Sequence, residues 1–339
     1  MAVCGGAAMP GNMLEHRQDP AGQQAVRHRA RQQGHLLRGV PISSIANDRI
    51  RAGDGHIDDR QAIHIDPDRR EIGGDQPGAA YGRLYDSDAA QGTKAAYLGA
   101  RLIAADLAAV GIDVDCLPVA DVPVSGADSV IGDRAYGESA EKVAVLARAV
   151  TDGLLAGGVL PVLKHIPGHG RATADSHRAL PVVEADQATL RSTDFAAFRP
   201  LSDLPLGMTA HVVYTAIDPI APATTSVTLV RDVIRGWLKF AGVLMSDDIS
   251  MNALSGSIEE RSRAAIAAGC DLVLHCSGEL EEMQAVASAA PLLTGEAAKR
   301  ADAALIRRGH VRKDDLAVLR AEWAALMHAD AGAGRRATS

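Results

Sequence analysis

The chain has 339 residues and a formal net charge of −7, and 47% of its residues are hydrophobic. This length fits one large α/β domain or two ordinary ones. No dense run of lysine and arginine with interleaved aromatic residues occurs, so nucleic-acid binding is not expected. The four cysteines form no Cys-x-x-Cys pair, and no apolar run is long enough to span a bilayer. No secretory signal opens the sequence, so we expect a cytoplasmic protein that binds no membrane.

Residues 1–80 differ in composition from the rest of the chain. They contain ten arginines and five histidines but no lysine and no aromatic residue, and they show no sustained helical or strand period. Such a segment buries too little apolar surface to offset the entropy lost on ordering. We therefore expect residues 1–80 to form an atypical, disordered segment, and residues 331–339 to form a frayed, disordered tail.

From Tyr81 onward, apolar residues recur with strand and helical periods in alternation. The patterns predict strands at 111–119, 158–164, 206–213, 242–248 and 270–275. They predict helices at 88–110, 139–156, 187–203, 227–239, 257–268, 279–290, 295–308 and 313–328. Strands that alternate with helices in this way imply βαβ units and a parallel sheet.

Two folds meet this description, a (β/α)8 barrel and a doubly wound sheet. Polar residues gather after most of the predicted strands, which is where barrel enzymes place their catalytic groups. A doubly wound sheet usually carries a glycine-rich phosphate loop after its first strand, and none is convincing here. The pattern therefore favours the α/β class with a TIM (β/α)8 barrel.

The most informative stretch is 161–177, where an apolar strand leads into a loop with one lysine, three histidines, one aspartate and two glycines. Asp175 precedes His177 by two residues, a spacing that lets a carboxylate orient an imidazole as a general acid/base. The three histidines lie four and eight residues apart in a loop broken by proline and glycine, a pattern that does not favour a metal site. A metal site and a loop merely braced by histidines are the alternatives.

Three further polar groups lie near the ends of predicted strands. Asp247 and Asp248 end the predicted strand at 242–248. Burying two carboxylates there costs free energy unless they have a role, for example one as a site residue and the other as the cap of the next helix. Arg134 lies in a glycine-flanked loop, from which it could fork to a ligand or form a local ion pair. His211 ends another strand, either as a site group or as a hydrogen-bonded core histidine.

Five motifs, taken together and in this order, resemble one known family, the bacterial β-N-acetylglucosaminidases (β-hexosaminidases) of glycoside hydrolase family 3, single-domain type. The resemblance covers about residues 81–330 and rests on Asp113–Val119, Ile131–Arg134, Lys164–Gly170 with Asp175–His177, Met208–His211 and Ser246–Met251.

The resemblance implies a single catalytic barrel over residues 81–330, a retaining mechanism, no cofactor and no metal. It places the nucleophile on Asp247 and the acid/base dyad on Asp175 and His177. The positions that match substrate contacts are Arg134, Lys164, His165, Asp121 and His211. The implied partner is a small carbohydrate, muropeptide-like or chitobiose-like, from which a terminal β-linked N-acetylglucosamine is removed during peptidoglycan turnover. We expect a monomer.

Three other functions remain open: a glycoside phosphorylase on the same scaffold, a degenerate sugar-binding protein without catalysis, and a metal hydrolase. The second is favoured by a departure from the family, whose barrel normally opens with two strand–helix units and an Asp-x-Glu-Gly-Gly motif. Residues 63–74 hold some of these letters in the wrong order. We hypothesise a shifted reading frame or a misplaced start before residue 81, and we expect little activity from this chain.

Overall fold

The computed structural model describes residues 2–3, 78–308 and 314–333. The segment expected to be disordered, 1–80, therefore lies almost entirely outside the described residues, and the hypothesis of a shifted reading frame is untested. Helix α9 (Leu316–Ala333) continues three residues into the expected tail, and residues 334–339 also lie outside the described part.

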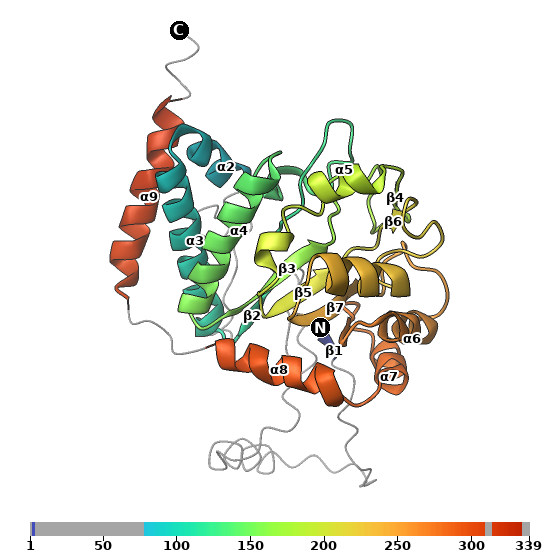
Figure 1. Ribbon diagram of the computed structural model, residues 1–339. Helices are drawn as coiled ribbons and strands as arrows, with labels where there is room; N and C mark the ends of the chain where they lie inside the picture. The colour runs from blue at the N-terminus through green and yellow to red at the C-terminus, as the bar shows by residue number, and fades with distance from the viewer. Residues whose placement is uncertain (1, 4–77, 309–313, 334–339) are drawn as a thin grey trace, which may run out of the picture.

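The centre of the fold is a sheet with the strand order β1-β8-β7-β5-β3-β2 (Figure 1). Its parallel strands are β2 (Val114–Asp115), β3 (Leu160–Ile166), β5 (Leu206–Thr209), β7 (Val243–Asp248) and β8 (Leu272–Leu274). The two-residue β1 (Ala2–Val3) pairs antiparallel with β8. A second, two-stranded sheet joins β4 (Val182–Val183) to β6 (Val213–Tyr214).

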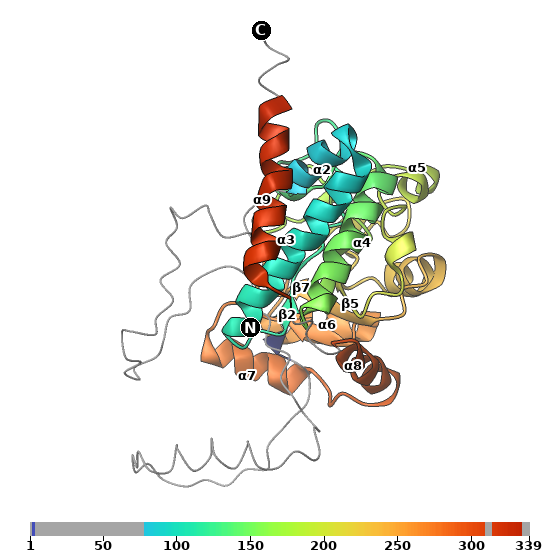
Figure 2. The same cartoon turned by 90° about the vertical axis from the view of Figure 1, so that its left-hand side faces the viewer.

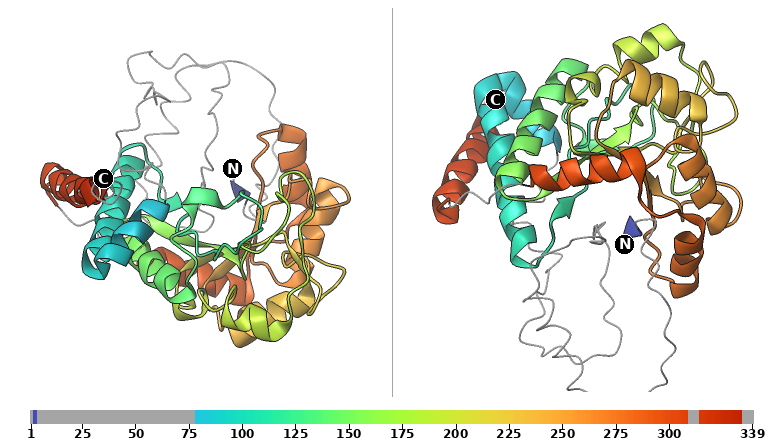
Figure 3. Two further views of the ribbon diagram at one scale, coloured as in Figure 1. Left: turned by 90° about the horizontal axis from the view of Figure 1, so that it is seen from above. Right: turned by 60° about the horizontal axis from the view of Figure 1, so that its bottom comes forward.

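The predicted TIM barrel is wrong for the part of the chain that the structure describes, which forms a half-barrel. A closed barrel of this class needs eight parallel strands, and the described residues contribute five. Within them β2 pairs only with β3, so the sheet has an edge where a barrel would continue. Viewed from above, the helices follow an arc around the sheet instead of a closed ring (Figure 3). The alternation of strands and helices predicts a parallel sheet, but it does not determine whether the sheet closes.

Eight α-helices cover the sheet within the described ranges. They are α2 (Gly78–Ser87), α3 (Ala89–Ala109), α4 (Ala140–Ala156), α5 (Gln187–Ser192), α6 (Ile258–Ala268), α7 (Leu280–Ala289), α8 (Gly295–Arg307) and α9. Side-chain caps fix several starts: Asp88 begins α3, Ser139 begins α4, and Ser257 forms a capping box with Glu260 at α6. Helix α3 lies between α4 and α9 (Figure 2).

Alternation along the strands divides the core into two clusters. Leu163, Leu244 and Val273 point into the larger one, which the surrounding helices complete. The neighbouring positions, such as Val162 and Met245, form a second cluster with Ala301 and Ala304 of α8. Both faces of the sheet are therefore apolar, as expected for parallel strands covered on two sides.

Two predicted helices differ from the structure. The segment 187–203 divides into α5, which ends where Thr193 leaves helical geometry (φ −122°, ψ −84°), and a 3₁₀ turn at η2 (Arg199–Leu201) with Pro200 in its first turn, a position that needs no amide hydrogen. The segment 227–239 is a π-helix, η3 (Leu229–Trp237), which the periodicity does not distinguish from an α-helix. The other predicted helices are confirmed to within a few residues, and the strand at 111–119 shortens to β2.

Candidate active site

Polar side chains gather at the carboxyl ends of the five parallel strands. Asp115 ends β2, Lys164 and His165 lie near the end of β3, Asp247 lies near the end of β7, and His275 follows β8. Because parallel neighbours end at the same edge of a sheet, residues far apart in sequence meet there. This edge is the candidate active site.

Asp247 is a buried carboxyl group at this edge, with 7% of its surface exposed. Its Oδ1 accepts the backbone N–H of Asp248 at 2.8 Å. Burial alone would raise the pKa of Asp247, but electrostatic interactions with the His165 and His211 rings and the hydrogen bond from the N–H of Asp248 lower it more, so the pKa lies below its ordinary value. The side chain is therefore an ionised carboxylate held close to two imidazoles and to the Lys164 ammonium group, a state suited to nucleophilic attack.

His211 is fully buried, and both of its ring nitrogens have partners. Its Nδ1 lies 2.6 Å from the hydroxyl of Thr224, and its Nε2 lies 3.0 Å from the backbone carbonyl of Asp248. Burial lowers the pKa of His211 below its ordinary value, although the Asp247 carboxylate opposes this effect. The Asp248 carbonyl can only accept, so a neutral ring donates from Nε2 and presents Nδ1 as an acceptor to Thr224, whose hydroxyl also lies 3.1 Å from the Ala210 carbonyl. His211 is thus a hydrogen-bonded core histidine that holds the end of β7.

A second buried carboxylate, Asp121, organises the start of the loop after β3. Its Oδ2 lies 2.7 Å from Nδ1 of His165, and its Oδ1 accepts the backbone N–H of His169 at 2.5 Å. Burial alone would raise the pKa of Asp121. The electrostatic interaction and the hydrogen bond with His165 lower the pKa by more than burial raises it, so the net shift is downward. The His165 and His169 rings meet edge to face, with centroids 5.9 Å apart.

His169 is the middle histidine of the loop after β3, and the family motif assigns it no role. It is 3% exposed, and neither ring nitrogen has a hydrogen-bond partner among the described residues. Burial lowers its pKa below the ordinary value. Its position in the histidine-rich motif was the available signal, but the motif does not say that the ring is buried behind His165.

Lys164 lies on β3, is half-buried, and forms an isolated bridge with Val119, four residues past the end of β2. Its charge counteracts the rise in the pKa of Asp115 that burial causes, although the pKa of Asp115 remains raised. It also helps to lower the pKa of Asp247. The ammonium group of Lys164 therefore interacts with both Asp115 and Asp247. From this position it could donate hydrogen bonds to a ligand rich in hydroxyl groups.

Asp175 and His177 form the predicted dyad. Oδ1 of Asp175 lies 2.9 Å from Nδ1 of His177 and also accepts the backbone N–H of that residue at 2.9 Å. The His177 side chain is 65% exposed. Although slight burial opposes it, the hydrogen bonds from His177 lower the pKa of Asp175. The ring is thus oriented with its Nε2 available, as a general acid/base requires.

The dyad lies at the same edge as Asp247 but is not in direct contact with it. The segment after β7 holds the dyad loop, because Asn252 donates from Nδ2 to the His177 carbonyl and the N–H of Ala253 donates to the Ser176 carbonyl. Asp121, His165 and Asp247 form a buried group, whereas Asp175 and His177 form an exposed one.

Arg134 lies apart from both groups. It ends the short 3₁₀ turn η1 (Gly132–Arg134), is exposed, and donates to the carbonyls of Val130 and Ile131 in its own loop. Asp248, in contrast, is engaged within its turn, since its carboxylate accepts from Ser250 and from the N–H of Cys276. Asp248 therefore caps a turn, whereas Ser257 caps the next helix.

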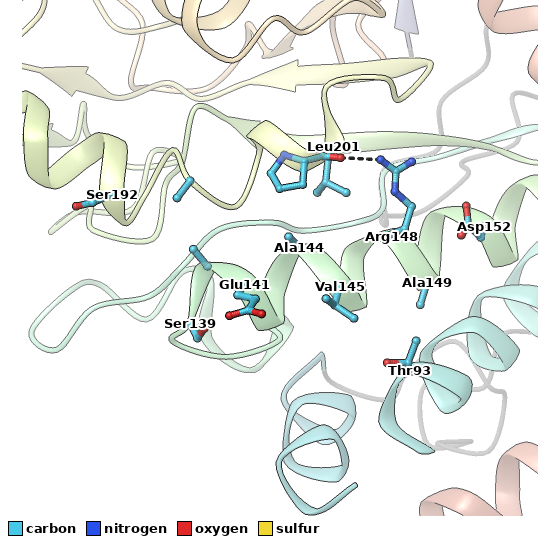
Figure 4. A pocket seen from close by; sticks show the side chains of 13 residues that line it. Thr93, Ser139, Glu141, Ala144, Val145, Arg148, Ala149, Asp152, Ser192 and Leu201 are labelled. Carbon is cyan, nitrogen blue, oxygen red and sulfur yellow. Dashed lines mark hydrogen bonds between the residues drawn. The ribbon is translucent and has the colours of Figure 1, made fainter. Parts of the chain in front are cut away.

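A groove among the described residues lies elsewhere on the molecule (Figure 4). It runs between α4 and the segment from α5 to η2, and its lining includes Ala144, Arg148, Ser192 and Leu201. None of the predicted site residues lines it. Among the described residues, no group of three or more histidine, cysteine, aspartate or glutamate side chains is arranged to hold a metal ion. No helix in these ranges is long and apolar enough to cross a membrane.

Curated relatives are similar to this chain over part of their length. A β-hexosaminidase of Alkalilimnicola ehrlichii is 42% identical over 198 residues, which are 57% of this chain and 56% of that protein. A β-hexosaminidase of Thioalkalivibrio sulfidiphilus is 43% identical over 203 residues, or 59% of this chain and 58% of that protein. The chain thus spans a little over half the length of these relatives.

Solved structures are similar as well. NagZ from Neisseria gonorrhoeae, in complex with N-trifluoroacetyl-D-glucosamine, is 31% identical with a TM-score of 0.65, covering 74% of this chain and 75% of that one. A glycoside hydrolase family 3 β-N-acetylglucosaminidase from Paenibacillus sp. is 31% identical with a TM-score of 0.62, covering 75% of this chain and 51% of that one. The profile of the glycosyl hydrolase family 3 N-terminal domain matches residues 84–307. The chain therefore belongs to glycosyl hydrolase family 3.

Proposed function

We propose that this protein is a retaining exo-β-N-acetylglucosaminidase with Asp247 as its nucleophile. The observation that carries the proposal is the buried Asp247 at the carboxyl edge of the sheet, whose pKa is lowered beside the His165 imidazole and the Lys164 ammonium group. A carboxylate in such a place is costly unless the site uses its charge. The β-hexosaminidase relatives and the family membership support the same reaction class.

In the first step, a carboxylate oxygen of Asp247 attacks the anomeric carbon while the glycosidic C–O bond breaks. His177 donates its Nε2 proton to the departing oxygen, and Asp175 stabilises the imidazole through Nδ1. In the second step, water attacks the same carbon and gives its proton to Nε2 of His177, and the Asp247 carboxylate leaves. The two inversions retain the anomeric configuration.

Lys164 and His165 are the substrate contacts that the geometry favours, because both lie beside Asp247 in the buried group. Arg134 is exposed and bonded only to backbone carbonyls, so a ligand could recruit its guanidinium. His211 has no free ring nitrogen, and we assign it a supporting role behind β7.

The proposed substrate is a terminal β-linked N-acetylglucosamine on a peptidoglycan turnover fragment. The similarity to a structure that binds N-trifluoroacetyl-D-glucosamine supports an N-acylated sugar at this site. A muropeptide-like or chitobiose-like partner, a cytoplasmic location and a monomeric state remain predictions from the sequence.

Release of p-nitrophenol from its β-N-acetylglucosaminide tests the proposal. We expect turnover that EDTA does not affect and a loss of roughly 10³-fold or more in Asp247→Asn. Asp248→Asn is the matched control, because asparagine can still cap the turn. If Asp247→Asn keeps the rate of the unmodified chain, the nucleophile assignment is wrong.

The same assay separates the other functions. A rate that depends on added phosphate, with a sugar phosphate as product, would identify a phosphorylase. Saturable binding of N-acetylglucosamine without turnover would identify a non-catalytic sugar-binding protein.

Mass spectrometry of a complex with a slow fluorinated substrate should find the sugar covalently attached to Asp247.

A further inference from the structure

Asp121 has no surface with which to touch a sugar. It is fully buried, with 0% of its surface exposed. Its Oδ2 accepts from Nδ1 of His165 at 2.7 Å and its Oδ1 accepts from the His169 N–H at 2.5 Å, while the N–H of His165 lies 3.3 Å and 3.4 Å from the two oxygens. Both oxygens are therefore occupied by protein donors, although the family resemblance places this residue among the substrate contacts.

His165 is the group through which Asp121 reaches the site. Its Nδ1 is turned to the carboxylate, and the structure gives its Nε2 no hydrogen bond among the described residues. About a tenth of the His165 side chain is exposed. The titratable groups around the ring, from its own loop and from the segments after β2, β5 and within β7, are Lys164, His169, Asp121, His211 and Asp247.

We propose that Asp121 is a positioning residue that fixes the proton of His165 on Nδ1, so that the Nε2 of that ring is the atom presented to the substrate. Two carboxylate–imidazole pairs therefore belong to the loop after β3: an exposed one, Asp175–His177, and a buried one, Asp121–His165. A third pair among the described residues, His275–Glu282, lies after β8. Behind a metal-binding imidazole, a carboxylate fixes the tautomer and ring orientation, and removal of such a partner typically costs 10- to 100-fold; we expect Asp121 to orient His165 in the same way.

The loop after β3 depends on the same carboxylate. Because Asp121 accepts the backbone N–H groups of both His165 and His169, it ties the two ends of the tight turn that contains Gly168. On the other side of the turn, the hydroxyl of Tyr214 donates to the Gly168 carbonyl. Asp121 therefore anchors the start of the loop that continues to the exposed dyad, Asp175 and His177. The same carboxylate thus positions both the proposed substrate contact His165 and the beginning of the dyad loop.

Nitrogen NMR of the His165 ring tests this proposal in the ligand-free chain, and this readout does not require activity. We expect a proton on Nδ1 in the unmodified protein, and a shift of the neutral ring toward the Nε2–H tautomer in Asp121→Asn. If the unmodified protein carries its neutral proton on Nε2, the proposal is overturned, and this spectrum decides the matter even if Asp121→Asn does not fold.

The activity readout rests on the proposed function. We expect Asp121→Asn to lower kcat/KM by about 10- to 100-fold. The control is Asp271→Asn, another buried carboxylate, which pairs with Arg235 and Arg300 beside the start of β8 at the opposite end of the strands. We expect this control to lose stability while the His165 tautomer stays unchanged. If both variants leave the tautomer unchanged, or both change it equally, Asp121 has only a structural role. If the unmodified chain has no activity, the proposed glycosidase function is wrong. The NMR measurement of the His165 tautomer still tests the role of Asp121 in that case.

Discussion

Replacing Asp271 by alanine should destabilise the fold more than any exposed charge would. The Asp271 side chain is 3% exposed and joins three elements at the end of the sheet opposite the candidate site. It accepts from Arg235 at 2.8 Å, from Arg300 at 2.9 Å and 2.5 Å, and from the N–H of Leu244 at 2.9 Å. Its loss removes the carboxylate partner of two partly buried guanidinium groups and the acceptor of one buried amide, while Arg235 keeps the carbonyls of Phe240 and Gly242.

The magnitude follows from the burial of each partner. Removing one member of a buried ion pair costs about 3–5 kcal/mol, and a lost amide bond adds to this. The side chains of Arg235 and Arg300 are 23% and 28% exposed, so water compensates part of the loss. We therefore expect a decrease of about 3 kcal/mol in the free energy of unfolding for Asp271→Ala, or roughly 6–12 °C in Tm.

Thermal and urea unfolding followed by circular dichroism measure this change. The comparison is Arg148→Ala, which breaks the exposed pair with Asp203 and should cost about 0–1 kcal/mol. If Asp271→Ala unfolds at the same urea concentration as Arg148→Ala, the network does not stabilise the fold and the reasoning from burial is refuted.

Three further outcomes can be measured. A Cβ at Gly170 would lie 2.1 Å from the backbone oxygen of Val122, so Gly170→Ala should cost about 1–3 kcal/mol and lower kcat/KM; an unchanged Tm would contradict this. His177→Ala should lower kcat by roughly 10²–10⁴-fold, and a normal rate would remove the acid/base assignment. Burial lowers the pKa of His169 and His211 in the folded state below the ordinary value of about 6.5. As the pH falls through that value, the histidines of the unfolded chain bind protons before those of the folded chain, so the free energy of unfolding decreases. Urea unfolding at pH 7 and pH 5 checks this, and a pH-independent midpoint in that interval would oppose it.

Local patterns in the sequence predict most of the described elements. The helices that begin with Asp88, Ser139 and Ser257 carry their caps in the sequence, and the five predicted strands correspond to the five parallel strands. Local patterns cannot predict whether the sheet closes into a barrel, because closure depends on which strands pair with the outer edge of β2. The π-helical hydrogen bonding of η3 is also invisible to periodicity, since the same apolar positions face the core in either kind of helix.

The chemistry of the site was predictable where two residues lie close in sequence. Asp175 and His177 are two residues apart, and their hydrogen bond is the one expected. The supports of the site are long-range: Thr224 reaches His211 across 13 residues, and His211 reaches the Asp248 carbonyl across 37. No spacing rule links such residues, because the contacts arise only when neighbouring strands align their carboxyl ends.

Asp121 illustrates why a matched motif position does not settle a residue's role. Its partner His165 is 44 residues away, and the two meet because Val119 pairs with Lys164 and the Ala120 N–H donates to the Lys164 carbonyl. This register places the next acid after β2 directly beside the histidine at the end of β3. A motif records that an acid occurs at this position, whereas its depth is set by the packing of two strands and a turn. Since Asp121 is fully buried and both of its oxygens already accept from protein donors, burial assigns this residue to the support of the site.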